Sequence, residues 1–171
     1  MINDASARGI PGAFTFDSYC TSAKLLNHIA STKRGYVGDL KLKRKVGYEG
    51  REQSLQAVAR QSPWQTQKPV RVGQRRYGYC RKQMRIPEVK HPVRIVLFWK
   101  ERDDAEASQA LVSNRLTWAV IRMVLVSRHR WTGTEMFHRD GKQELGRGDC
   151  QVRNGEGQTR HFYLVLLVHS L

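Results

Sequence analysis

The chain has 171 residues, and its 30 lysines and arginines against 15 aspartates and glutamates give a formal net charge of +15. Apolar residues make up 40% of the sequence, which is enough for a packed domain and excludes wholesale disorder. Because the cations are spread along the whole chain, the charge favours a polyanionic partner, and nucleic acid is the polyanion that fits best.

The sequence contains no segment that predicts export or membrane insertion. The longest apolar run, Phe162 to Val168, is far too short to span a bilayer. Residues 1–9 lack the apolar core of a signal peptide. The cysteines, Cys20, Cys80 and Cys150, are widely spaced and match no zinc-binding pattern. We therefore expect a cytoplasmic protein with reduced thiols and no membrane partner.

The N-terminal part predicts an α/β unit. A short β-prone run from Ala13 to Phe16 stops at Asp17, a helix fits Thr21 to Thr32, and a strand fits Tyr36 to Leu40. Asp17 then lies just past the C-terminal end of a strand, where open α/β sheets place their chemistry. An aspartate at this position is also typical of a turn or a helix N-cap.

The middle of the chain predicts a mostly β insertion. The basic run Lys41–Lys45 fits a solvated edge or a phosphate contact. From residue 46 to residue 100, short β-prone runs are separated by prolines, with a weak helix from Ser54 to Arg60. Val93 to Trp99 is nearly continuously apolar and predicts a central strand.

Cations in this region alternate with Trp64, Tyr77 and Tyr79, a mixture that suits nucleic acid and equally suits ordinary strands. These cations are Arg71, Arg75, Arg76, Arg81, Lys82 and Arg85.

After residue 100 we expect an acidic loop, a short strand and a helix. Asp103 and Asp104 are typical of a solvated turn rather than of a metal site. A strand fits Ala110 to Asn114, and a helix fits Thr117 to His129. The apolar residues expected on its buried face are Val120, Ile121, Val124 and Leu125.

The segment from Arg130 to Lys142 places the carboxylate of Glu135 among cations and aromatic residues. In a helix, Arg139 and Lys142 share a face with Glu135, because they follow it by four and seven residues. A carboxylate that can bind a divalent metal, beside cations that can hold phosphate, is what cutting and joining a nucleic-acid backbone needs. A single Glu on a basic helix is also common as a solvated surface residue.

Two parts of the sequence together match a known pattern. They are Asp17 within Phe-Thr-Phe-Asp-Ser-Tyr, and a later set made of Arg130, Trp131, Glu135, Phe137, Lys142 and Leu145-Gly146. From Ala13 onward the chain resembles the C-terminal two-thirds of a DDE transposase of a bacterial insertion sequence, in the branch with a Tyr-Arg-Glu-Lys motif. Ser127 stands where that motif has its Tyr, and one extra residue separates Arg130 from Glu135.

The resemblance implies an α/β, RNase H-like mixed sheet with flanking helices and a β-rich insertion, with the N-terminal strands missing. Residues 1–45 and 101–171 would be two parts of the RNase H-like core, and residues 46–100 the insertion.

The resemblance also implies metal-dependent cleavage and transfer of DNA strands. Asp17 and Glu135 would be catalytic residues and ligands of Mg²⁺ or Mn²⁺. The DNA-binding residues at the transposon ends would be Arg130, Lys142, Trp131 and Arg139. The family's first catalytic Asp would lie upstream of Met1, so we expect the chain alone to be inactive, with a full-length transposase or a second copy as possible partners.

Two non-catalytic interpretations stay open. The chain fits a remnant that binds transposon ends without chemistry, and it fits a basic RNA- or ribosome-associated protein. The second alternative gives Asp17 and Glu135 no role and expects RNA to be preferred over duplex DNA at equal salt.

Overall fold

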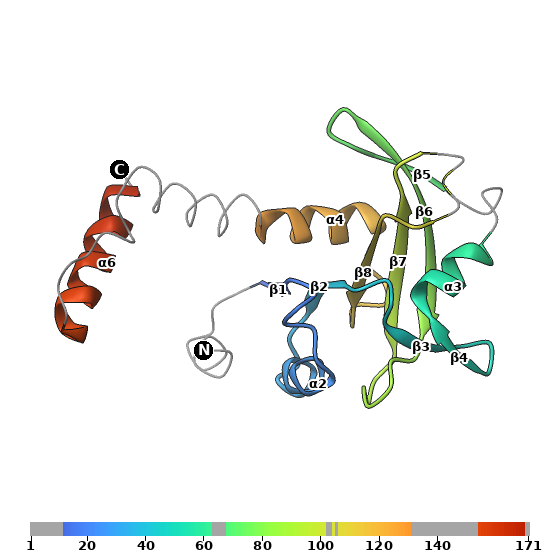
Figure 1. The fold of residues 1–171 in the computed structure, drawn as a ribbon, viewed down its shortest axis with the longest axis horizontal. Helices are drawn as coiled ribbons and strands as arrows, with labels where there is room; N and C mark the ends of the chain where they lie inside the picture. Colours follow the sequence, from blue (N-terminus) through green and yellow to red (C-terminus); the bar gives the residue numbers. More distant parts are fainter. Residues whose placement is uncertain (1–11, 63–67, 102–103, 105, 131–153, 170–171) are drawn as a thin grey trace. The chain divides into compact units, whose positions relative to one another are not determined.

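The structure is a computed structural model that describes residues 12–62, 68–101, 104, 106–130 and 154–169 (Figure 1). The chain divides into two compact units, Met1–Ser127 and Arg128–Leu171, and each is described by itself. None of the helices in these ranges combines the length and apolar character needed to cross a bilayer.

The first unit is built on a six-stranded mixed sheet, which confirms the α/β class. Its strands, in spatial order, are β1 (Phe14–Phe16), β2 (Tyr36–Leu40), β8 (Gln109–Ser113), β7 (Val93–Trp99), β6 (Arg75–Met84) and β5 (Lys68–Val72). β1 and β2 are parallel, and every other neighbouring pair is antiparallel. The observed bounds of β2 and β7 are those predicted from the sequence, and β7 lies inside the sheet as expected.

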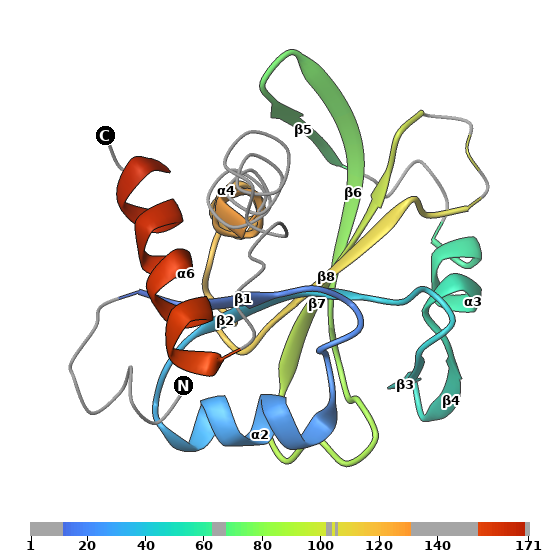
Figure 2. The ribbon, with the colours of Figure 1, turned by 60° about the vertical axis from the view of Figure 1, so that its left-hand side comes forward.

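Helices cover both faces of this sheet (Figure 2). Helix α2 (Ala23–Ser31) begins at its N-cap Ser22, whose Oγ accepts a hydrogen bond from the amide of Leu25 at 3.2 Å. Leu26 and Ile29 of this helix are buried in one core cluster. Helix α4 (Val120–His129) contributes to the cluster on the opposite face.

The region from 46 to 100, expected to be rich in β structure, supplies most of the remaining elements. A separate hairpin is formed by β3 (Lys45–Tyr48) and β4 (Arg51–Ser54). Helix α3 (Leu55–Arg60) follows, capped by Ser54, where a weak helix was predicted. β5, β6 and β7 complete the region and belong to the six-stranded sheet.

The two core clusters follow the alternation of side chains along β7. Ile95 and Leu97 point into the cluster shared with α2 and α3, whereas Val96 and Phe98 point into the cluster shared with α4. The strand is therefore buried on both faces, which explains its continuous apolar sequence.

The buried face predicted for α4 is wrong at two positions. Ile121 and Leu125 are exposed, at 41% and 50%, whereas Val120, Met123 and Ser127 are buried. Both sets have helical spacing, and packing against Val96 and Phe98 in the second cluster selects the stripe that contains Met123.

The second unit contains one described helix, α6 (Gly155–His169). Tyr163 and Leu164 of this helix are exposed. The predicted division into a core of 1–45 and 101–171 with an insertion of 46–100 stays a prediction.

Candidate metal and nucleic-acid site

Asp17 directly follows β1, at the C-terminal end of this strand, and is half-buried. Its Oδ1 accepts hydrogen bonds from the amides of Tyr19 at 2.9 Å and Cys20 at 2.8 Å. The carboxylate therefore stabilises the turn between β1 and α2, as turn aspartates do. The N-cap of α2 is Ser22 and not Asp17.

A second carboxylate, Asp39, lies at the same end of the parallel pair. Phe16 is paired with Gly38 in the register of β1 with β2. Asp17 follows Phe16 and Asp39 follows Gly38, so the two aspartates lie at the same end of the pair. The buried hydroxyl of Thr21 lies 2.7 Å from the carbonyl oxygens of both aspartates. The side chain of Asp39 accepts a hydrogen bond from Nε2 of Gln109 at 2.9 Å.

Sequence reasoning missed Asp39. The signal that could have found it is the parallel pairing itself, because an Asp ends β1 and another lies near the end of β2. Thr21 was expected only at the start of a helix, but the structure shows that it links the ends of the two strands.

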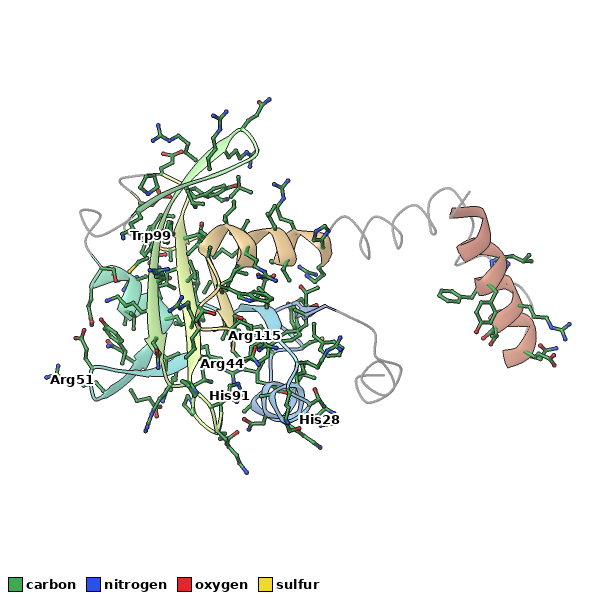
Figure 3. All side chains as sticks on the ribbon, turned by 180° about the vertical axis from the view of Figure 1, so that it is seen from behind. His28, Arg44, Arg51, His91, Trp99 and Arg115 are labelled. Atoms are coloured by element: carbon green, nitrogen blue, oxygen red, sulfur yellow. The ribbon has the colours of Figure 1, made fainter. Side chains whose placement is uncertain are left out.

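The basic segment (Lys41–Lys45) runs beside this strand end. The Nζ of Lys41 lies 4.0 Å from the centroid of the Tyr19 ring. Nη1 of Arg44, a residue labelled in Figure 3, donates a hydrogen bond to the carbonyl of Thr21 at 2.6 Å. These contacts hold cations next to the turn that Asp17 stabilises.

The chemistry of Asp17 suits a hard divalent cation, because Mg²⁺ takes carboxylate oxygens. Among the described residues there is no group of three or more His, Cys, Asp or Glu placed to hold a metal ion. That Asp17 binds a metal ion stays a prediction. Glu135, the predicted second ligand, lies outside the described residues.

The predicted DNA-binding residues are only partly described. Arg130 is half-buried and directly follows α4. Trp131, Arg139 and Lys142 lie outside the described residues. That these side chains lie close to Asp17 stays a prediction.

The acidic loop after β7 agrees with the expected solvated turn where it is described. Asp104 is exposed, and its Oδ2 accepts a hydrogen bond from the amide of Glu101 at 3.1 Å. Asp103 lies outside the described residues.

No family model matches the sequence, and no curated protein matches it significantly.

Proposed function

We propose that this chain is part of the catalytic domain of a DDE transposase of a bacterial insertion sequence, with the DNA of transposon ends as its substrate. The observation that carries the proposal is the position of Asp17. This carboxylate lies at the end of a strand in a parallel pair, beside a basic segment that includes Lys41 and Arg44. A metal-binding carboxylate beside phosphate-binding cations is what phosphoryl transfer on DNA requires.

We further propose that the sheet is RNase H-like. Support comes from the mixed sheet, in which the parallel pair β1–β2 continues an antiparallel series of strands. Further support comes from the helices on both faces, with α2 on one and α4 on the other.

In this proposal Asp17 and Glu135 hold Mg²⁺ or Mn²⁺. When bound, such ions stabilise the charge that develops on the attacking and leaving oxygens of the phosphodiester. The hydrogen bonds from the Tyr19 and Cys20 amides fix the orientation of the Asp17 carboxylate before any ion binds. Arg130, Trp131, Arg139 and Lys142 contact the DNA.

The family uses three carboxylates, and the proposal identifies two, Asp17 and Glu135. We therefore expect purified protein to bind duplex DNA without cutting it in Mg²⁺ or Mn²⁺. A nicking assay on the element's terminal repeats checks this, and robust cleavage by the chain alone contradicts it.

The phosphate-binding role of the basic segment is tested by replacing Lys41 and Lys43 with Gln. Loss of two phosphate contacts reduces the slope of log K against log salt by about two and weakens binding about tenfold near 0.1 M salt. The matched control is Arg51→Gln/Lys90→Gln, which replaces two exposed cations outside the basic segment. Equal slopes for the two double variants contradict the assignment.

A non-catalytic nucleic-acid-binding protein is the second candidate. It is favoured by one observation, the use of Asp17 Oδ1 to hold the turn through Tyr19 and Cys20. An aspartate with this structural role needs no metal. For this candidate, alanine at Glu135 leaves both nucleic-acid binding and Mn²⁺ binding unchanged, and an RNA-associated protein binds duplex RNA more tightly than duplex DNA.

A further inference from the structure

The hairpin formed by β5 and β6 (the β5–β6 hairpin, Lys68–Met84) is strongly cationic. It contains no Asp or Glu. Its cations are Lys68, Arg71, Arg75, Arg76, Arg81 and Lys82, and all but Lys82 are exposed. A surface of one sign on a small element indicates a polyanionic partner.

The strand register places two of these cations directly opposite each other. Arg71 of β5 is paired with Arg76 of β6, and the next pair toward the turn is Val72 with Arg75. Like charges directly opposite on neighbouring strands destabilise a hairpin. Nε of Arg71 also donates a hydrogen bond to the carbonyl of Gly73 at 3.1 Å, which keeps its guanidinium near the turn. We therefore expect the two arginines to repel each other in the free protein, and a bound polyanion to relieve that repulsion.

The turn end of the hairpin forms a projecting two-stranded ribbon, because β6 is paired with β7 only from Gly78 onward. β5 is an edge strand of the sheet, and Figures 1 and 2 show the turn of the hairpin standing clear of the helices of its unit. The ribbon is anchored at its base, because Val70, Tyr77 and Tyr79 pack against the core cluster that contains Phe98. Its tip, with Arg71 and Arg76, is left to solvent.

The two-stranded shape of the ribbon favours one class of nucleic acid. The major groove of B-form DNA is about 12 Å wide and admits a two-stranded β-ribbon. The major groove of A-form RNA is deep and narrow and does not admit such an element.

We propose that the β5–β6 hairpin is an arm that enters the major groove of duplex DNA, where Arg71 and Arg76 contact the backbone phosphates on its two sides. The inference rests on the proposed function to the extent that both assign DNA as the partner. The inference identifies the hairpin as the surface that binds the duplex, and this binding requires neither Asp17 nor a metal.

The test measures two properties of the Arg71→Gln/Arg76→Gln variant. Affinity for a short duplex, followed by fluorescence anisotropy, should fall about tenfold near 0.1 M salt, with the salt slope reduced by about two. The melting temperature without DNA should stay the same or rise, because the repelling pair is gone. The control is Arg51→Gln/Lys90→Gln, with the same charge change elsewhere on the first unit; Arg51 is labelled in Figure 3.

A second variant, Arg71→Glu, separates charge from folding. It creates an opposite-charge pair with Arg76, so the melting temperature should rise while DNA affinity falls further. A lower melting temperature in both variants overturns the repulsion argument. The proposed DNA-binding role of the hairpin is contradicted if Arg71→Gln/Arg76→Gln binds duplex DNA as tightly as the control variant does. It is also contradicted if the wild type binds an RNA duplex more tightly than a DNA duplex of the same sequence.

The outcomes also separate this inference from the proposed function. If the wild type binds duplex DNA but the hairpin variant binds like the control, the arm alone is wrong. If the hairpin variant loses binding while neither Asp17→Ala nor Glu135→Ala changes Mn²⁺ binding, the transposase proposal fails and the arm stands.

Discussion

Asp17 and Asp39, at the C-terminal ends of neighbouring parallel strands, offer their carbonyl oxygens to one hydroxyl, Oγ1 of Thr21, at 2.7 Å each. A hydroxyl has one proton, so it can donate to only one of the two carbonyls at a time. Thr21 is 3% exposed, so water cannot readily replace it. Thr21 therefore links the backbone at Asp17 to the end of β2.

Replacing Thr21 with Val keeps the shape of the side chain and removes the hydroxyl. Because the carbonyl oxygens of Asp17 and Asp39 then lose this donor, we expect the free energy of unfolding to fall by about 1–3 kcal/mol. Urea denaturation measures this change. Thr117→Val, at an exposed threonine, is the matched control and should change stability by less than about 0.5 kcal/mol. Equal losses for the two variants contradict the role of Thr21.

Gly38 allows the ring of Phe16 to lie across β2. A Cβ at Gly38 would stand 2.1 Å from Cε2 of that ring, so Gly38→Ala should lower the free energy of unfolding by about 1–3 kcal/mol. Gly47 is the control, because a Cβ there meets its nearest neighbour, Cβ of Arg85, at 3.6 Å. Its alanine variant should stay within about 1 kcal/mol of wild type.

The same clash predicts coupling between the two positions. Phe16→Ala/Gly38→Ala should be less destabilised than the sum of its single variants, because removal of the ring makes room for the new methyl group. Strict additivity in urea denaturation counts against the observed contact.

Stability should depend on pH through His91, whose Nε2 lies 2.9 Å from the hydroxyl of the buried Tyr36. Burial lowers the pKa of His91 in the folded protein, so the unfolded chain binds the proton more tightly. The stability from neutral His91 is present above the usual imidazole pKa, about 6.5, and is lost as the pH falls from there toward the lowered value.

We therefore expect His91→Gln to show a smaller loss of stability than wild type between about pH 7 and pH 5. Thermal melts across this range provide the measurement. His28→Gln, at an exposed histidine on α2 that is labelled with His91 in Figure 3, should keep the wild-type slope. Parallel curves for wild type and His91→Gln are the contradicting result.

The sequence predicted elements best where burial and chain pattern agree. β7 is buried on both faces, so its apolar run had only one interpretation. The α/β order around Asp17 was also recoverable, because a β-prone run, a capped helix and a second strand follow one another within a short stretch. The buried face of α4 could not be predicted from the sequence. Ile121 and Met123 both lie on apolar faces with helical spacing, and only packing against the sheet decides which face is buried.

The candidate site was predictable only in part for a similar reason. Asp17 could be singled out by its place after a strand, but the nearness of Asp39 depends on the register of β1 with β2. The contacts of Lys41 with Tyr19 and of Arg44 with Thr21 depend on how the chain turns after β2, which local propensity does not specify.

The central claim is that Asp17 and Glu135 bind the same metal ion, and iron-directed cleavage of the protein tests it most directly. Fe²⁺ replaces Mg²⁺ in the full chain, and ascorbate with peroxide then breaks the backbone near the bound ion. The account predicts backbone breaks close to residue 17 and close to residue 135 in the wild type. Asp17→Ala and Glu135→Ala should each lose the breaks at both places, whereas the exposed control Glu52→Ala should keep them. Breaks at only one of the two segments, or breaks that survive either substitution, would contradict the account.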